Sequence, residues 1–447
     1  MSEPIISVSG LRGTIGDQLT PLVAARYAAA LAATLPKGTV VIGRDGRSSG
    51  SMLAAVVSAT LQAHGLDVAD LGPASTPTVG VQVRALKAVG GIQISASHNP
   101  KEYNGLKLFG SDGRVLSKHL GENVLSGYRN NAHRWVNVDN LGKPVHVADP
   151  HAVHLGKVLD TVDVDLIRSK KFRVVLDSNH GAGGILGARL LQELGCDFTV
   201  LGLEPNGQFW HKPEPLAENL VEVANRVRHE KADVCFCQDP DADRLAVIDE
   251  NGHFIGEELT LALCLLQSLP SIKTAGYVVT NCATSSVSKF VAEKFGHKLL
   301  QSAVGEANVA DCMIANAAVF GGEGNGGPID PAVGYVRDSF VGMARILCLL
   351  AQTGQTVSQH VASLPPLAMV KDKVTLDGSE LPRLFEKLIA GMPGAQVSRM
   401  DGLKLEWPDR WLLVRGSNTE PIVRFIAEAP TTELARQLCD AGIKLTK

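Results

Sequence analysis

Aromatic residues and long apolar runs are scarce in this chain, and each scarcity excludes a class of protein. Aromatic side chains make up 5% of the 447 residues, against 45 glycines, a balance typical of α/β proteins with many tight strand-to-helix turns. No stretch reaches the unbroken apolar length of a membrane span, and the N-terminus lacks the basic and apolar parts of a signal peptide. The sequence therefore predicts a cytoplasmic protein that makes no contact with a membrane.

Cysteine is also sparse, and the eight cysteines follow no disulfide-framework spacing. Cys264 and Cys348 lie inside apolar runs, where reduced and buried thiols are expected. Cys235 and Cys237 are separated by one residue, so both would point to the same side of a strand, but no second pair completes a zinc site. We predict neither disulfides nor a zinc centre.

An excess of charge of one sign is missing as well. The 43 Lys and Arg residues nearly balance the 46 Asp and Glu residues, the formal net charge is −3, and no long run of like charges occurs. Such a chain lacks the excess of basic residues that is typical of proteins that bind nucleic acid. Any anionic ligand must therefore be bound by a local cluster of residues.

The chain is longer than a single hydrophobic core supports, so several domains are expected. Three stretches, starting at Thr39, Phe172 and Gly276, share the order strand, Gly/Ser-rich loop and amphipathic helix, which is typical of βαβ units. After Leu-Pro-Pro at 364–366, short strands and two helices, one of them over 379–390, indicate an antiparallel sheet with helices on one face.

These patterns predict the fold class α/β, with three similar α/β domains built on mixed, mainly parallel sheets and a smaller C-terminal α+β domain. The boundaries are placed in polar, irregular stretches. They divide the chain into 1–148, 149–250, 251–366 and 367–447.

The first segment with candidate chemistry is GGIQISASHNPKEYNGLKLF, from Gly91. A buried strand runs into a turn that contains Ser97 and His98. The carboxyl end of a parallel strand is where α/β sheets place ligands, and His98 could bind or orient a phosphate. A polar loop with an N-capping serine is an equally good interpretation of this segment alone.

The second segment places Asp239, Asp241 and Asp243 at alternate positions of one short loop between two strands. Three carboxylates this close repel one another unless a cation lies among them, and hard oxygen ligands suit magnesium or calcium. The loop is not an EF-hand, because it lacks the glycine required at loop position six. An acidic surface turn is the alternative.

Two further segments are glycine-rich or cationic turns. AVFGGEGNGG, from Ala318, sets Glu323 and Asn325 among glycines, so the backbone can approach a ligand while a carboxylate and an amide bind hydroxyls. RGSNTEPIVRF, from Arg415, offers side chains and backbone N–H groups for a phosphate dianion. Either segment alone could equally be a turn that only reverses the chain and binds no ligand.

In this order, the segments resemble the α-D-phosphohexomutase family. The motifs are GLRGTIG at Gly10, GRDGRSS at Gly43, SASHNP at Ser95, DPDADR at Asp239, GEGNGG at Gly322 and RGSNTEP at Arg415. The resemblance covers the whole chain. It implies three related α/β domains and a smaller C-terminal domain around a central cleft, with the C-terminal domain opening and closing during turnover.

The resemblance also implies a role for each candidate residue. Ser97 matches the serine that carries phosphate, and this phosphate with Asp239, Asp241 and Asp243 would hold one Mg²⁺ per chain. Near the reacting oxygens lie Arg12, Lys107, His98 and Arg244, with Lys107 favoured over Arg12 as proton acceptor and His98 also possible. Glu323 and Asn325 would bind the sugar, and the non-reacting phosphate would be held by Arg415, Ser417, Asn418, Thr419 and Arg424.

The implied activity is that of an isomerase, an intramolecular phosphotransferase that interconverts hexose 6-phosphates and hexose 1-phosphates. It would use a phosphoserine enzyme and a bisphosphate intermediate, with hexose 1,6-bisphosphate as activator. Asn325 stands where the family often has serine, and Gly327 stands where it often has histidine. The identity of the substrate sugar therefore stays open. Phosphoglucosamine mutase is preferred and a broad phosphomannomutase/phosphoglucomutase is the alternative, while a magnesium-dependent sugar phosphatase and a non-catalytic sugar-phosphate sensor are remote. The chain would act as a monomer or homodimer.

Overall fold

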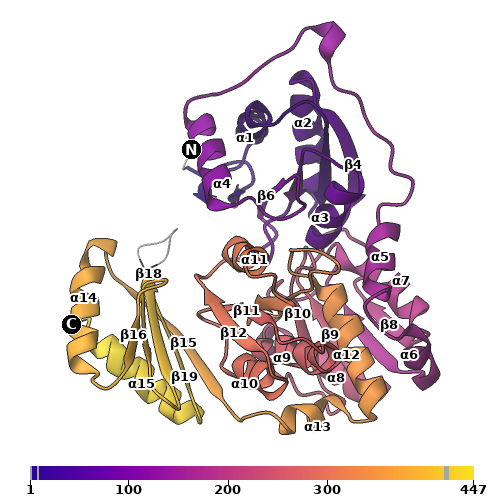
Figure 1. Ribbon diagram of the computed structural model, residues 1–447. Helices are drawn as coiled ribbons and strands as arrows, with labels where there is room; N and C mark the ends of the chain where they lie inside the picture. The colour runs from indigo at the N-terminus through magenta and orange to yellow at the C-terminus, as the bar shows by residue number, and fades with distance from the viewer. Residues whose placement is uncertain (1–2, 8–9, 417–421, 447) are drawn as a thin grey trace.

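The computed structural model describes residues 3–7, 10–416 and 422–446. Its strands form four sheets, of which three are mixed and the last is antiparallel. Figure 1 shows the first sheet at the top, the second and third below it, and the fourth at the lower left. This arrangement confirms the predicted fold class. Across the described ranges, no helix is both long and apolar enough to cross a membrane.

The first sheet has the strand order β1-β2-β6-β5-β3-β4. Its strands are β1 (Ile5–Ser7), β2 (Gly10–Thr14), β3 (Thr39–Arg44), β4 (Asp67–Pro73), β5 (Gly90–Ile94) and β6 (Tyr103–Gly110). β3, β4 and β5 are parallel, and β6, β2 and β1 continue the sheet through antiparallel pairs. One face is covered by α1 (Pro21–Thr34), α2 (Gly50–Ala63) and α4 (Lys118–Arg129), the other by α3 (Thr76–Ala85).

The second and third sheets share one plan, in which three parallel strands end in an antiparallel edge strand. The second, ordered β10-β9-β7-β8, contains β7 (Arg173–Asp177), β8 (Asp197–Leu201), β9 (Val234–Gln238) and β10 (Leu245–Ile248). The third, ordered β12-β11-β13-β14, contains β11 (Tyr277–Asn281), β12 (Lys298–Ser302), β13 (Phe320–Glu323) and β14 (Gly327–Ile329).

Helices of these two units bury one common hydrophobic core. It joins residues from both sheets, such as Phe236 and Phe320, with almost the whole of α12. The helices are α5 (Ala152–Leu159), α6 (Val164–Lys170), α7 (Gly183–Glu193), α8 (Val221–Glu230), α9 (Glu257–Ser268), α10 (Val287–Lys294), α11 (Glu306–Ala315), α12 (Ser339–Thr353) and α13 (Val357–Ala362). The second and third units are therefore packed as a single block.

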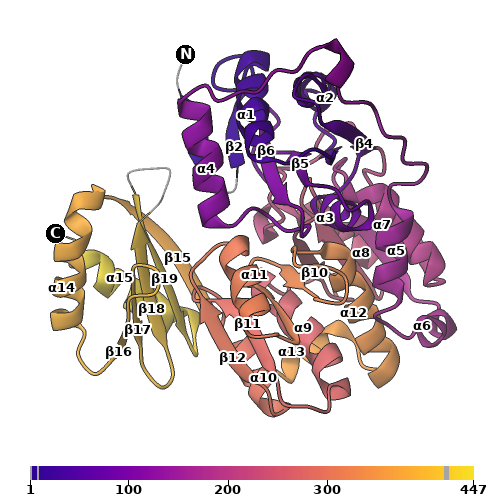
Figure 2. The ribbon, with the colours of Figure 1, turned by 45° about the horizontal axis from the view of Figure 1, so that its top comes forward.

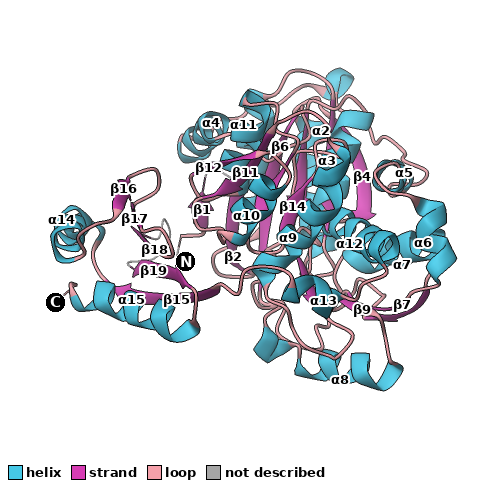
Figure 3. Ribbon diagram, turned by 60° about the horizontal axis from the view of Figure 1, so that its bottom comes forward, coloured by secondary structure: helices cyan, strands magenta, loops and turns pink. Residues whose placement is uncertain are grey.

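The fourth sheet is antiparallel, as predicted, with the order β15-β19-β18-β17-β16. Its strands are β15 (Ala368–Thr375), β16 (Gln396–Ser398), β17 (Leu403–Glu406), β18 (Trp411–Gly416) and β19 (Ile422–Ala429). Helices α14 (Leu381–Gly391) and α15 (Thr432–Lys444) cover one face. The other face packs against the third unit through Trp411 and Cys282. Figure 3 shows this domain as a distinct body beside the others.

Two local expectations have clear outcomes. The helix expected over 379–390 begins as a 3-10 turn, since Pro382 occupies the first turn of α14 and has no N–H to extend a helix backwards. Cys235 and Cys237 lie on one side of β9 with their sulfurs 3.7 Å apart, and all eight cysteines are free. The other short 3-10 helices are η1 (Val138–Asn140), η2 (Ala217–Asn219) and η3 (Leu269–Ser271), and η4 is Gly378–Glu380.

Candidate active site

Three loops that follow strands β5, β9 and β13 carry the predicted residues. The loop after β5 holds Ser97, the loop after β9 holds the three aspartates, and β13 ends at Glu323. Helix α3 lies at the junction of the first and second units (Figure 2), where its first residue, Thr76, donates its backbone N–H to the carbonyl oxygen of Asp241 at 2.9 Å. The serine loop and the aspartate loop therefore meet at this junction.

Ser97 is buried and points into the aspartate cluster. Its Oγ donates to Asp239 Oδ2 at 2.9 Å, and its backbone N–H donates to Ser95 Oγ at 2.8 Å. Its φ of +49° lies in the left-handed region, which a serine adopts only when its surroundings impose it. The turn thus presents the hydroxyl to the carboxylates at a cost in backbone strain.

Arg47 holds this strained turn in place, although the sequence analysis assigned no role to this residue. Its terminal nitrogens donate to the carbonyl oxygens of Ser97 (2.7 Å), Asn99 (2.6 Å), Pro100 (2.6 Å) and Tyr103 (3.0 Å). Asp45 Oδ2 accepts from Arg47 Nε at 3.0 Å and from Ser95 Oγ at 2.7 Å. Both charged residues are fully or almost fully buried. The signal was present in the sequence as Asp-x-Arg directly after a buried strand.

The three aspartates form a completely buried cluster, with one carboxylate oxygen of each within 4.8 Å of the others. Asp239 Oδ1 accepts from the backbone N–H groups of Asp243 and Arg244 at 3.2 and 3.1 Å. Asp241 Oδ1 and Asp243 Oδ1 have no hydrogen-bond partner in the described part of the chain. Buried, unpaired carboxylate oxygens are costly, and they are the ligands that Mg²⁺ takes. The cluster therefore fits a divalent cation.

Lys107 supplies part of the compensating charge. Its Nζ lies 3.1 Å from Asp241 Oδ2 and 2.8 Å from Asp243 Oδ2. Burial alone would lower the pKa of Lys107, but the charges of Asp241 and Asp243 outweigh burial and raise it. Lys107 is thus firmly protonated in this arrangement. The pKa of Asp239 lies well above the ordinary value, because burial and the charges of Asp241 and Asp243 all raise it.

Pairing of β2 with β6 explains why Arg12 lies beside Lys107. Arg12 is directly opposite Gly105 and Lys107 is directly opposite Gly10, so both cations lie on one face of the sheet. A Cβ on Gly105 would lie 2.5 Å from the carbonyl oxygen of Leu11 and 3.0 Å from Arg12 Cγ, so only glycine leaves room. Arg12 Nη1 donates to Asn99 Oδ1 at 3.3 Å. Burial lowers the pKa of Arg12.

His98 and Arg244 complete the surroundings of Ser97. His98 Nδ1 is 3.3 Å from Ser97 Oγ. Burial, with Arg244 and Arg12 nearby, lowers the pKa of His98 to about 3, so the imidazole is neutral near pH 7. Arg244 Nε lies 3.9 Å from Asp243 Oδ1 and has no hydrogen-bond partner among the described residues.

Glu323 is buried and its carboxylate is occupied by protein donors. Oε1 accepts from Asn281 Nδ2 at 2.7 Å and from the Gly305 N–H at 3.2 Å. Oε2 accepts from Arg337 Nη1 at 2.9 Å and lies 3.5 Å from Asn325 Nδ2. Asn325 Oδ1 is buried without a partner among the described residues. The sequence analysis did not single out Arg337, and the only signal was an Arg-Asp pair before α12.

The C-terminal domain contributes a row of cations. Arg424 on β19 lies directly opposite Arg415 on β18 and Lys373 on β15, so the three side chains share one face. Arg415 Nε is 3.1 Å from Asp401 Oδ2, which also accepts from the Val304 N–H at 2.9 Å.

Three of the predicted phosphate ligands, Ser417, Asn418 and Thr419, lie outside the described residues. Where the chain is described, no hydrogen bond or ion pair joins Arg415 or Arg424 to Ser97 or to the three aspartates. The structure therefore groups the predicted residues into two sets, one around Ser97, Asp243 and Glu323 and one on the C-terminal sheet.

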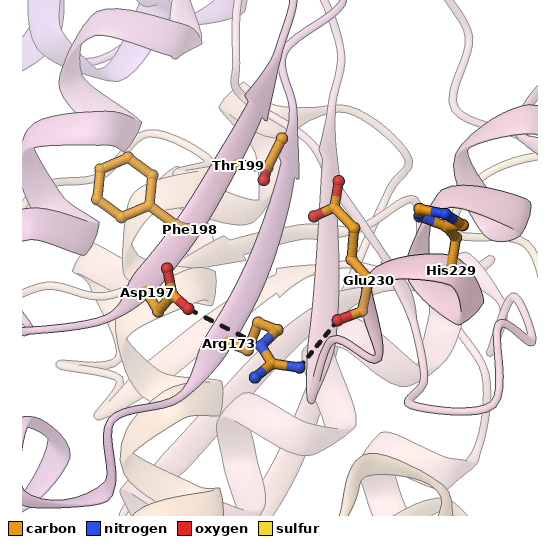
Figure 4. A pocket seen from close by; sticks show the side chains of 6 residues that line it. All are labelled: Arg173, Asp197, Phe198, Thr199, His229 and Glu230. Atoms are coloured by element: carbon orange, nitrogen blue, oxygen red, sulfur yellow. Dashed lines mark hydrogen bonds and ion pairs between the residues drawn. The ribbon is translucent and has the colours of Figure 1, made fainter.

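A cavity of ≈ 260 Å³ lies elsewhere, at the opposite end of the second sheet (Figure 4). It is lined by Arg173, Asp197, Phe198, Thr199, His229 and Glu230. Arg173 and Asp197 begin β7 and β8, whereas the aspartate loop follows the end of β9. No predicted site residue lines this cavity, so we do not place the chemistry there.

Comparison with known proteins gives full-length matches. Four family models, described as phosphoglucomutase/phosphomannomutase alpha/beta/alpha domains I, II and III and C-terminal domain, match residues 5–134, 150–252, 258–367 and 371–444. A probable phosphoglucosamine mutase of Methanopyrus kandleri and a phosphoglucomutase/phosphomannomutase of Thermococcus kodakarensis are each 34% identical, over 98% of this chain and 97% of the relative. The crystal structure of a phosphoglucomutase/phosphomannomutase family protein from Burkholderia thailandensis has a TM-score of 0.87 at 26% identity, covering 99% of this chain and 98% of that chain.

Proposed function

This chain belongs to the phosphoglucomutase/phosphomannomutase family of phosphohexomutases, and we propose that it interconverts hexose 6-phosphates and hexose 1-phosphates through a phosphoserine at Ser97. One observation carries the proposal: the Ser97 hydroxyl lies 2.9 Å from Asp239 within a buried cluster of three carboxylates. A serine that only capped a helix would not need a strained turn held by a buried arginine.

The metal in this proposal is one Mg²⁺, held by Asp239, Asp241, Asp243 and the phosphate on Ser97. The unpaired oxygens of Asp241 and Asp243 support this choice. When bound, Mg²⁺ would offset negative charge on the transferring phosphoryl group. A hexose 1,6-bisphosphate would serve as activator by phosphorylating Ser97.

Different residues of the chain have different roles in phosphoryl transfer. The bond from phosphorus to Ser97 Oγ breaks, and a new bond forms to the free hydroxyl of the sugar phosphate, whose proton must leave. Lys107 would first have to release its own proton, which Asp241 and Asp243 oppose. His98 lies 3.3 Å from Ser97 Oγ, and the negative charge of a phosphate on Ser97 would raise the lowered pKa of its imidazole, so we assign the proton to His98. Lys107, Arg12 and Arg244 offset charge on the phosphate.

The second transfer reverses these roles after the bisphosphate has turned over. Arg415, Ser417, Asn418, Thr419 and Arg424 hold the phosphate that is not reacting, while Glu323 and Asn325 bind the sugar. Because the intermediate must reorient, the predicted opening and closing of the C-terminal domain belongs to the proposal. The cytoplasmic location, the absence of nucleic-acid binding and the monomer-or-homodimer state stay predictions.

The preferred substrate is a glucosamine phosphate, with a broad phosphomannomutase/phosphoglucomutase as the alternative. Relatives of both kinds match the chain at equal identity. A sugar phosphatase would not need Ser97 at the carboxylates, and a sensor would not need three buried aspartates with unpaired oxygens. These two possibilities are therefore set aside.

The test is the interconversion of the 6-phosphates and 1-phosphates of glucosamine, glucose and mannose, with Mg²⁺ and a catalytic amount of bisphosphate. We expect Ser97→Ala to abolish activity, and Asp241→Asn to weaken Mg²⁺ binding at least about tenfold in calorimetry as one of three carboxylates loses its charge. Ser126→Ala, at an exposed serine of α4, is the matched control. Full activity of Ser97→Ala, or no turnover of any hexose phosphate by the wild type, would refute the proposal.

A further inference from the structure

Arg337 is a buried cation at the centre of the predicted sugar site. It lies in the segment before α12 and exposes only 7% of its surface. Its side chain contacts three carboxylates: Glu323 Oε2 at 2.9 Å, Asp243 Oδ2 at 2.7 Å and Glu306 Oε2 at 3.6 Å. Its backbone N–H donates to Glu306 Oε1 at 2.9 Å. One guanidinium therefore links the predicted sugar-binding carboxylate to the predicted metal loop.

Gly327 makes this position possible. In the β13–β14 pair, Gly327 lies directly opposite Glu323. A Cβ on Gly327 would lie 2.3 Å from Arg337 Cδ and 2.8 Å from Arg337 Cγ, closer than real carbon contacts allow. The space in which any side chain at position 327 would begin is thus filled by Arg337. This is the position at which the resembling family often has histidine.

We propose that Arg337, for which Gly327 leaves room, is a positioning residue that sets the charge and the direction of the Glu323 carboxylate. The inference rests on the proposed function and deepens it, because it concerns which sugars that site accepts. The forked guanidinium suits such a task, since it can bind two carboxylates at once and always stays charged.

The contact between Arg337 and Glu323 affects how strongly the site prefers amino sugars. Arg337 shares one positive charge among Glu323, Asp243 and Glu306, so it offsets part of the negative charge of Glu323 and weakens the attraction of this carboxylate for a ring ammonium. Removing Arg337 exposes that charge and shifts the preference toward glucosamine phosphate.

The experiment compares kcat/KM for glucosamine 6-phosphate with kcat/KM for glucose 6-phosphate in the full-length enzyme. For Arg337→Met we expect this ratio to rise about tenfold over wild type, whatever happens to the absolute rates. Arg337→Lys keeps the charge but loses the fork, so both rates fall while the ratio stays near the wild-type value. A merely structural role would lower both rates in Arg337→Met and leave the ratio unchanged.

A second variant covers the case in which Arg337→Met does not fold. Gly327→Ala pushes the Arg337 side chain away from Glu323, and we expect it to raise the same ratio. The matched control is Arg345→Met, because the Arg345 side chain in α12 is 13% exposed against 8% for Arg337, and it pairs with Asp330 at 2.6 Å and Gln267 at 2.8 Å without touching Glu323. Its ratio should equal that of the wild type.

The outcomes separate the two proposals. If the wild type turns over none of the glucosamine, glucose and mannose phosphates, the proposed function fails. If the wild type is active but the ratio is unchanged in Arg337→Met and in Gly327→Ala, the inference about Arg337 is wrong and the proposed function stands.

Discussion

Arg47 is the residue on which the geometry of the Ser97 turn depends, since it donates to four carbonyl oxygens of that turn. Arg47→Lys keeps the charge but cannot form the same set of hydrogen bonds. We expect kcat/KM to fall by about 100-fold, because a displacement of about 1 Å at a reacting atom costs that much. Steady-state kinetics on the best hexose phosphate measures this effect.

The control for this substitution is Arg26→Lys. Arg26 lies over the ring of Tyr128 at 5.0 Å and makes only an exposed hydrogen bond, so its replacement should leave kcat/KM unchanged. Equal activities of the two variants would show that the Ser97 turn does not need Arg47.

Glu258 makes stability depend on pH. Burial raises its pKa to about 8, and its Oε2 accepts from the Ser285 N–H at 2.9 Å beside the backbone of Gly324. Between the ordinary value of 4.5 and about 8, the folded chain holds a proton that the unfolded chain releases. The free energy of unfolding therefore falls as pH rises through this window.

Glu258→Gln stays neutral at every pH, so it should remove this dependence. We expect the variant to be more stable than the wild type at pH 8 by on the order of 3 kcal/mol, with little difference at pH 4.5. Urea unfolding at the two pH values measures both quantities. A wild type that keeps its stability from pH 4.5 to 8 would contradict the assignment.

Ser97 and the three aspartates could be predicted because each belongs to a short motif after a strand. The roles of Arg47 and Arg337 could not, even though Asp45-Gly46-Arg47 follows a buried strand, because the groups they bind lie far away in sequence: Arg47 binds carbonyl oxygens some 50 positions along the chain, and Arg337 pairs with Asp243. Buried ion pairs of this kind are set by tertiary packing, which the pattern of single residues does not reveal.

At the scale of elements, β15, β19 and β18 align Lys373, Arg424 and Arg415 in one row. Like charges directly opposite one another are unfavourable unless an anion lies among them. We expect Lys373→Gln to raise KM for hexose phosphates several-fold with kcat nearly unchanged, because the row binds a phosphate equally in the ground and transition states. Initial rates over a range of substrate concentrations give both constants.

Arg383→Gln serves as the comparison, since Arg383 is exposed on α14, which covers the other face of this sheet. Its KM should match that of the wild type. A fall in kcat for Lys373→Gln at constant KM would place Lys373 in the chemical step instead.

Most strands followed from alternating or continuous apolar runs, but the pairing of β2 with β6 did not. The segment GLRGT has two glycines and an arginine in five residues, so it has little strand propensity of its own. It becomes a strand because β6 offers an edge about 90 residues later. This pairing also explains why the first sheet contains more antiparallel strands than a succession of βαβ units alone would form.

At the scale of the whole molecule, the buried carboxylate of Glu428 is one of the contacts that join the C-terminal domain to the third unit. Glu428 accepts from Trp411 Nε1 at 2.7 Å and from the Ser286 N–H at 3.0 Å, at the start of α10. Glu428→Ala leaves the Ser286 N–H unpaired and leaves Trp411 Nε1 with the Ser286 hydroxyl at 3.1 Å as its acceptor, at a cost of about 1–3 kcal/mol. We expect faster hydrogen exchange at this contact and an earlier loss of residues 367–447 on heating.

Exchange mass spectrometry resolves the effect by segment, with Glu433→Ala at an exposed position of α15 as the control. A uniform change over the whole chain would mean that the C-terminal domain does not separate at this contact. The order of the four units could be predicted from sequence, whereas this joint could not, because Trp411 and Glu428, directly opposite each other on β18 and β19, share no motif with Ser286 of the third unit.

A phosphoserine mutase passes phosphate through Ser97, and this passage can be followed with labelled phosphate. The enzyme would be incubated with Mg²⁺ and a hexose 1,6-bisphosphate labelled in both phosphates, then divided: one part would be digested to locate the label, and the other, intact, would be chased with an unlabelled hexose 6-phosphate. The account predicts label on the peptide that contains Ser97, released by the chase at least as fast as the enzyme turns over, and no label in Ser97→Ala. Label on any other residue, or release much slower than turnover, would contradict it.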